Sequence, residues 1–155
     1  MGIAGIKEYF KNINTNHEKI AKENFEFLLS RGYKFTNPKN SYICFGLLYQ
    51  KDELIIQISY DYREHYLDVG LRRINYPINI LNIYMDILNT DISTPQKRED
   101  LKKSVENARL NSNDFKFGLR KDDYILMVKL YADFVRENLE QIESWKPMII
   151  SNDTN

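Results

Sequence analysis

Residues 56–61 read IQISYD, with an apolar or aromatic side chain at every second position, and this alternation constrains the fold most. Successive side chains of a β-strand point to opposite faces, so the segment predicts a strand with one face on a core. The extended segment covers residues 54–61 as a whole. Residues 41–49 and 66–72 flank it as two further extended segments, and short polar stretches separate the three. The spacing predicts an antiparallel meander of two hairpins.

The two predicted hairpins can be aligned by asking which register places apolar residues opposite each other. Centred on Lys51–Asp52, the first hairpin pairs Ile43 with Tyr60, Phe45 with Ile58 and Leu47 with Ile56. Centred on Arg63–Glu64, the second pairs Tyr60 with Leu67, Ile58 with Val69 and Ile56 with Leu71. Both alignments turn Ile56, Ile58 and Tyr60 toward one apolar face, and a one-residue slip in either would break that agreement.

Apolar residues recur at helical spacing on both sides of the predicted sheet. The predicted helices are a short one at 3–12, one that starts near Thr15, and others at about 77–88, 95–110 and 122–143. The helix from Thr15 has a candidate capping box with Glu18, and Gly32 is placed to end it in a left-handed conformation.

Local signals also mark the ends of the later helices. Thr94 is an N-cap candidate because Pro95 follows it at the first helical position. The helix at about 95–110 has few apolar residues and is expected on the surface. The helix at about 122–143 is expected to end before Pro147, with Trp145 packing back on the body. The segment 77–88 has Pro77 in its first turn and carries the spacing Ile80, Ile83, Tyr84, Ile87, Leu88.

The order of these elements predicts an α+β fold. Its antiparallel three- to four-stranded β-meander, at about 33–72, packs against an N-terminal helix and C-terminal helices. The chain has 155 residues and no internal repeat, so one domain is expected at 1–150, followed by a disordered tail at 151–155.

Charge and cysteine content exclude some classes of protein. The 22 Lys and Arg residues balance 22 Asp and Glu residues, which argues against a nucleic-acid-binding protein, because such proteins need a basic surplus. The single cysteine, Cys44, excludes an internal disulfide. No signal peptide and no membrane-spanning segment is recognised, so a cytoplasmic protein without a membrane partner is expected.

The stretch DYREH, residues 61–65, gathers two carboxylates, an arginine and a histidine in five positions. Such residues serve acid–base chemistry or bind metals in many enzymes. No second cluster elsewhere in the sequence completes a site. We therefore interpret DYREH as the polar tip of the second hairpin, with a partner-contacting loop and a catalytic site as the alternatives.

Other candidate groups have ordinary structural interpretations. His17 is expected on the surface of its helix, and Cys44 is expected to act as a small hydrophobe within a strand. Phosphate-binding loops, zinc-ligand spacings and the serine elbow are all missing from the sequence. We predict no catalytic residue, no metal ligand and no cofactor.

The second face of the predicted sheet is polar and aromatic. The register places Cys44 opposite Ser59 and Gly46 opposite Gln57, which in turn faces Gly70, so the middle of this face is shallow. A glycine in a strand often marks the close approach of another backbone. Two interpretations remain open at this point: one of the chain's own helices covers part of this face, or the face binds a partner.

The chain resembles small bacterial α+β proteins in the order of its parts. The resemblance is carried by a leading helix that ends FLLSRGYKF, a meander with IQISYDYREHYLDVGL and a final amphipathic helix LYADFVRENLEQI. Among such proteins are immunity proteins that neutralise polymorphic or contact-dependent toxins. The resemblance implies a binding protein that blocks a toxin domain, and it transfers no functional residue.

We therefore expect a non-enzymatic protein-binding module whose partner is a protein, such as a toxin domain. The residues predicted to contact the partner are Tyr42, Gln57, Asp61, Arg63, Glu64, His65, Tyr66, Asp68 and Arg72. The alternative is a small-ligand-binding protein or an enzyme that uses a pocket between the sheet and the helices. The sequence does not define the oligomeric state.

Overall fold

A computed structural model describes residues 2–36, 44–64, 66–74, 84–112 and 119–147. The helices are α1 (Ile3–Phe25), α2 (Phe27–Ser30), the 3-10 helix η1 (Ile87–Asn89), α3 (Pro95–Asn111), α4 (Lys121–Glu137) and α5 (Leu139–Ser144). The strands are β1 (Lys34–Thr36), β2 (Cys44–Lys51), β3 (Leu54–Asp61), β4 (Tyr66–Arg73) and β5 (Met85–Asp86).

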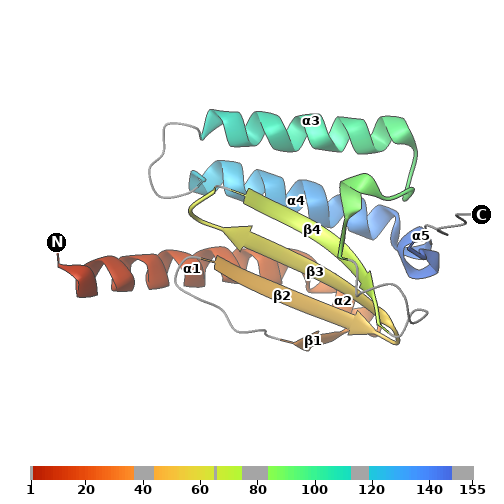
Figure 1. The fold of residues 1–155 in the computed structure, drawn as a ribbon, viewed down its shortest axis with the longest axis horizontal. Coiled ribbons are helices and arrows are strands. Elements are labelled where there is room, and N and C mark those ends of the chain that lie inside the picture. The colour runs from red at the N-terminus through yellow and green to blue at the C-terminus, as the bar shows by residue number, and fades with distance from the viewer. Residues whose placement is uncertain (1, 37–43, 65, 75–83, 113–118, 148–155) are drawn as a thin grey trace, which may run out of the picture.

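The described strands form one antiparallel sheet in the order β1-β2-β3-β4-β5, which confirms the predicted α+β class (Figure 1). β1 is a short edge strand that pairs Phe35 with Tyr49. At the other edge β5 pairs only Met85 and Asp86 with the far half of β4. The meander is thus one strand longer than predicted.

The predicted register is confirmed for the second hairpin and wrong by two residues for the first. β3 and β4 pair Ile56 with Leu71, as expected. β2 and β3 pair Phe45 with Tyr60, because the connection is formed by Asp52 and Glu53 instead of Lys51 and Asp52. Asp52 has φ 53°, a left-handed conformation that aspartate tolerates. A shift of two residues equals the side-chain period, so every residue keeps its predicted face.

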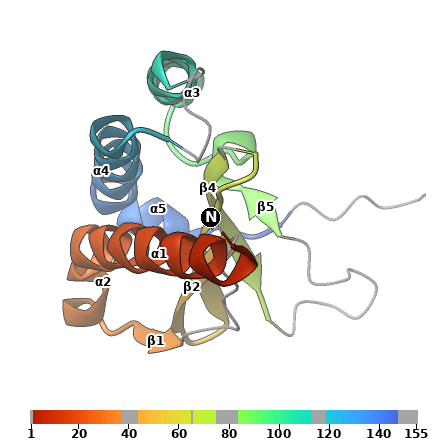
Figure 2. The same ribbon diagram turned by 90° about the vertical axis from the view of Figure 1, so that its left-hand side faces the viewer.

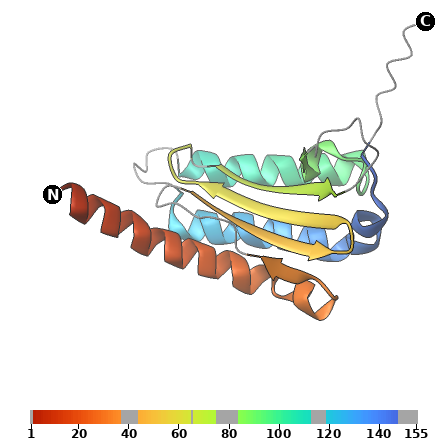
Figure 3. The same cartoon turned by 60° about the horizontal axis from the view of Figure 1, so that its bottom comes forward.

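All described helices lie on one face of the sheet or beyond its edge (Figures 2 and 3). In Figure 2 α1 and α4 lie side by side against the strands, and α3 lies farther out, next to α4. The core between the sheet and these helices is fully buried at Ile56, Ile58, Val69 and Leu71. The alternation of the sequence therefore does place one face of the meander inward.

Two predicted helix ends are confirmed by their hydrogen bonds. Gly32 has φ 92°, and the amides of Gly32 and Tyr33 donate to the carbonyls of Leu29 and Leu28. This is the pattern of a left-handed helix cap. At the start of α3, the hydroxyl of Thr94 accepts from the amide of Lys97 at 3.2 Å, as expected of an N-cap.

The predicted start at Thr15 is wrong, because α1 runs without interruption from Ile3 to Phe25. The segments interpreted as two helices, 3–12 and the one from Thr15, are therefore one helix as far as Phe25. The helix that Gly32 ends is the short α2, which begins after Glu26. His17 is consequently not in a first turn but in the middle of a helix. A capping signal predicts a helix start only where the preceding residues are not helical. Here the preceding residues also have helical spacing, so the helix continues through Thr15.

The predicted helix at about 77–88 is wrong where the structure describes it. Met85 and Asp86 pair with β4, and Ile87–Asn89 form a 3-10 turn; residues 77–83 of this prediction lie outside the described residues. The carboxylate of Asp86 accepts from the amide of Leu88 at 2.9 Å and so starts that turn. The buried side chain of Ile87 fits a strand followed by a turn as well as it fits a helix.

The C-terminal helix carries the predicted apolar face but is divided in two. Asn138, with φ −114°, separates α4 from α5, and the side-chain amide of Asn138 donates to the carbonyl of Phe134. Trp145 is buried, as predicted. The guanidinium of Arg73 donates to the carbonyls of Trp145, at 2.6 Å, and Glu143, which ties the end of β4 to the end of α5.

No helix in the described parts of the chain is long and apolar enough to cross a bilayer. The tail predicted at 151–155 lies outside the described residues.

Candidate functional site

Asp61 shapes the hairpin tip through its hydrogen bonds to Arg63. Oδ1 accepts from the Arg63 amide at 2.8 Å, and Oδ2 accepts from Nη2 at 3.1 Å. Burial alone would raise the pKa of Asp61, but the hydrogen bonds and charge of Arg63 outweigh it and lower that pKa below its usual range. Asp61 and Arg63 thus neutralise each other, and Glu64 is the exposed carboxylate of the tip.

The tip is held against α3 by Arg109, a residue that sequence reasoning missed. Its Nη2 donates to the carbonyl of Glu64 at 3.1 Å, and its guanidinium lies over the ring of Tyr66, 5.4 Å from the centroid. Tyr66 remains 41% exposed. We define the hairpin-tip patch as Asp61, Arg63, Glu64, Tyr66 and Arg109. No local signal could have found Arg109, because it lies 45 residues from Glu64 in the chain.

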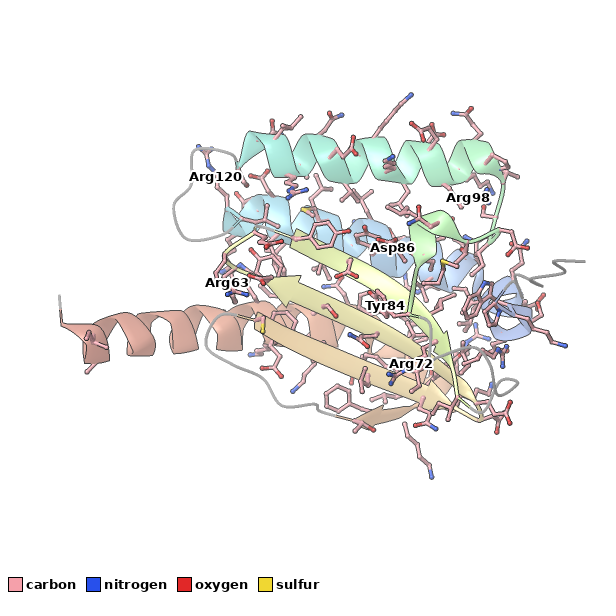
Figure 4. All side chains as sticks on the ribbon, viewed as in Figure 1. Arg63, Arg72, Tyr84, Asp86, Arg98 and Arg120 are labelled. Carbon is pink, nitrogen blue, oxygen red and sulfur yellow. The ribbon has the colours of Figure 1, made fainter. Side chains whose placement is uncertain are left out.

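The predicted partner-binding residues do not form one site. Arg72 lies near the far end of β4, six residues or about 20 Å of extended chain from Tyr66. Figure 4 shows Arg63 and Arg72 toward opposite ends of the sheet. Gln57 lies in the middle of β3, where its side chain donates to the hydroxyl of Ser59 at 2.9 Å. Tyr42 and His65 lie outside the described residues.

The second face of the sheet has no described helix upon it, so the interpretation that one of these helices covers it is wrong for that part of the chain (Figure 2). The face is nevertheless only partly open. Gln57 and Ser59 are half-buried, and Ile55 is 4% exposed. The corrected register places Gly46 opposite Ser59 and confirms Gly70 opposite Gln57.

Tyr84 occupies the space that Gly70 leaves on this face. A Cβ atom added at Gly70 would lie 2.0 Å from Cζ of the Tyr84 ring, so no other residue fits there without displacing the ring. The Tyr84 hydroxyl donates to the carboxylate of Asp68, which precedes Gly70 by two residues on β4. The close approach that a strand glycine indicates is therefore made by a side chain of the same protein.

Replacing Gly70 by alanine is expected to displace Tyr84 and break its hydrogen bond to Asp68. Overpacking of this kind costs about 1–3 kcal/mol of unfolding free energy, which urea denaturation would measure. In a Tyr84→Ala background the same Gly70→Ala change is expected to cost much less, because the ring is gone. Equal costs in both backgrounds would show that Tyr84 does not fill this space.

Two carboxylates and two tyrosines gather where β4 meets β5, and we call Tyr66, Asp68, Tyr84 and Asp86 the carboxylate–tyrosine cluster. The Tyr66 hydroxyl donates to Asp86 at 3.3 Å, in parallel with the Tyr84–Asp68 bond. Burial raises the pKa of Asp68 to about 6, with the nearby charge of Asp86 adding to the shift and the Tyr84 hydrogen bond opposing it. Burial and the same carboxylates raise the pKa of Tyr84.

A cavity of about 260 Å³ opens beside this cluster, between β4, η1, α3 and α4. Its buried floor consists of Leu67, Val105, Met127 and Tyr131. Its rim carries Tyr66 and Asp86 on one side and three α3 side chains, Lys102, Glu106 and Arg109, on the other. The cavity thus adjoins the hairpin-tip patch, since Tyr66 and Arg109 belong to both.

His17 was expected on the surface, and the structure corrects this. It is 8% exposed, and its ring lies parallel to that of Tyr60, with centroids 5.5 Å apart. Tyr62 and Tyr124 pack around the same imidazole ring, at 5.2 and 4.2 Å. His17 lies on the same face of α1 as the buried Ala21 and Phe25, four and eight residues further on, so it belongs to the core.

Among the described residues, no group of three or more His, Cys, Asp or Glu side chains is arranged to hold a metal ion. Comparison with known proteins adds no functional parallel. No protein-family model, no curated protein and no solved structure matches the chain.

Proposed function

We propose that this protein binds another protein through the hairpin-tip patch. The observation that carries the proposal is the Tyr66–Arg109 pair: an exposed tyrosine ring whose face is covered by a guanidinium that the Glu64 carbonyl also holds. Tyrosine and arginine dominate the binding energy of many protein interfaces, and side chains that are already held lose little entropy on binding.

The patch carries charges of both signs at its surface. Asp61 is paired with Arg63, and Asp68, outside the patch, is half-buried and bound by the Tyr84 hydroxyl, so Glu64 is the exposed carboxylate of the patch that can meet a partner's cation. The Arg109 guanidinium can in turn meet a partner's carboxylate. Such a mixed surface favours one orientation of the partner more than it strengthens long-range attraction.

In the form that the resemblance to immunity proteins implies, the partner is a toxin domain and the mechanism is occlusion. The patch would cover the partner's active site with a rigid hairpin end, so this chain needs no catalytic group of its own. The rigidity of the tip supports this mechanism, because both Asp61 and Arg109 hold it in place.

A photo-reactive residue at position 63 tests the proposal in cells of the native source. We expect one crosslinked product of constant mass, and none from the same residue placed at exposed Glu99 on α3. With the purified partner, Tyr66→Ala should weaken binding by about 2 kcal/mol or more, while Tyr66→Phe keeps the ring under Arg109 and should cost far less. Identical products from both positions, or none, would contradict the proposal.

The cavity favours a second function, the binding of a small ligand between the sheet and the helices. A ligand at 100 times its Kd would raise the unfolding free energy by about 2.7 kcal/mol, which a thermal-shift panel of metabolites would detect. At about 260 Å³ the cavity lies below the roughly 300–1,000 Å³ of sites that enclose drug-sized molecules. Protein binding therefore remains the first proposal.

A further inference from the structure

The inner part of the cavity is lined by apolar and aromatic side chains. Its charged side chains differ in how exposed they are. Lys102, Glu106 and Arg109 are exposed on the rim, where solvent screens them. Asp86 is half-buried, and Asp68 lies close enough for the charge of Asp86 to affect its pKa. Asp86 is therefore the least exposed charged side chain that lines the cavity, and its charge acts on Tyr131 at the floor, which favours a guest with a positive charge.

Tyr131 provides an independent sign of a guest. The side chain comes from α4, lines the cavity and is 2% exposed, yet its hydroxyl makes no hydrogen bond to any described residue. Burial, with the charges of Asp86 and then of Tyr66 and Asp68, raises the pKa of Tyr131, so the phenol stays neutral and its oxygen can accept a hydrogen bond. The hydroxyl oxygen is not fully enclosed by protein, so a donor on a guest in the cavity can reach it.

The remaining wall matches an aliphatic stem. Val105 and Met127 are buried side chains at the floor, and the ring of Tyr66 stands at the mouth. An ammonium group has three donors and no acceptor, and it is attracted to aromatic faces as well as to carboxylates. Long basic side chains commonly lay their methylene stem along apolar surface while the charged end reaches polar groups.

We propose that the cavity receives the lysine side chain of a protein partner, with its ammonium group between the Asp86 carboxylate and the Tyr131 hydroxyl. The inference rests on the proposed function, since the lysine is supplied by the protein that the hairpin-tip patch binds. Beyond that function, it specifies that the partner's anchor residue is a lysine. A basic side chain next to an interface centred on Tyr66 would be buried on binding, which is where anchor residues act.

A titration of the full chain with short capped peptides tests this without the partner. The probe is acetyl-Gly-Lys-Gly-amide, followed by the NMR signals of the tyrosine rings. We expect saturable, millimolar binding, and about tenfold weaker binding of the norleucine peptide, which has a similar stem but no charge. The glutamate peptide should not bind. Equal binding of the norleucine and lysine peptides, or tighter binding of the glutamate peptide, would overturn the proposal.

Variants locate the site. Asp86→Asn keeps one oxygen to accept from the Leu88 amide, and its NH2 group replaces the oxygen that accepts from the Tyr66 hydroxyl, to which it can donate. The variant is expected to weaken the binding of the lysine peptide by about tenfold. Tyr131→Phe should weaken it by a few-fold. Glu99→Gln, on α3 but outside the cavity, is the matched control and should change nothing. Unchanged binding in Asp86→Asn would overturn the proposal even if the peptide binds.

A free amine is the remaining source of the same chemistry, and n-butylamine represents it. We expect it to bind no more tightly than the peptide, and binding tenfold tighter would assign the cavity to free amines and overturn the lysine proposal. Failure of the peptide titration leaves crosslinking from position 63 unaffected, whereas failure of crosslinking leaves the titration interpretable. The failure of one proposal can therefore be told apart from the failure of the other.

Discussion

Replacing Tyr60 by alanine is expected to lower the free energy of unfolding by about 3–5 kcal/mol, the range for truncating a buried aromatic residue. Tyr60 lies near the end of the central strand β3, is 1% exposed and contacts the rings of His17, Tyr62 and Tyr124. Alanine would leave a cavity where α1, β3 and α4 meet. Because single domains are stable by about 5–15 kcal/mol, urea denaturation should show a large shift of the midpoint.

Tyr60→Phe separates the hydroxyl from the ring. The Tyr60 hydroxyl accepts from the amide of Leu119 at 2.9 Å, so phenylalanine leaves a buried N–H group without an acceptor. The expected cost is about 1–3 kcal/mol. A loss below about 1 kcal/mol in the alanine variant would contradict the burial of Tyr60 between the sheet and the helices.

Replacing Asp68 by asparagine is expected to stabilise the protein at neutral pH, contrary to the usual effect of removing a hydrogen-bonded carboxylate. The pKa of Asp68 rises from the model-compound value of 3.8 to about 6 in the folded state, because burial disfavours its charge. The folded state then binds more protons than the unfolded state between about pH 4 and 6, so stability falls as the pH rises through that window.

The size of the effect follows from the shift. About two pKa units correspond to roughly 3 kcal/mol, and solvent access to this half-buried group reduces that toward about 1 kcal/mol. Asparagine keeps an oxygen to accept from the Tyr84 hydroxyl. The measurement is the unfolding free energy of both proteins from pH 4 to 7.5, in which the gap should open as the pH rises.

The exposed carboxylate of Asp91 supplies the control for this comparison. Asp91→Asn should change stability by less than about 0.5 kcal/mol at any pH in the range. The prediction is contradicted if Asp68→Asn is less stable than the original protein at pH 7.5, or if the two curves of stability against pH run parallel. Either result would show that burial does not destabilise the charged form of Asp68.

The candidate site was only partly predictable. Tyr66, Asp68 and the tip residues were identified because the alternation of β4 and the polar turn place them on one surface. Asp86 and Arg109 were not, since each reaches the site from a segment that is distant in sequence. Arg109 lies in a charged helix where nothing local distinguishes it from its neighbours. Arg72 was predicted to bind the partner only because it shares a sheet face with Tyr66 and Asp68. Alternation specifies the face of a strand but not the end of the strand at which a site forms.

The sequence by itself determined the features that depend on neighbouring residues: the inward face of the meander, the β3–β4 register, and the helix ends at Gly32 and Thr94. Side-chain period and capping chemistry act within a few residues, so they can be read without the fold. Tertiary contacts decided the rest. Pairing with β4 places Met85 and Asp86 in a strand instead of the predicted helix, and packing against Tyr60 buries His17. Local spacing permits more than one structure in such segments, and the contact that chooses between them comes from elsewhere in the chain.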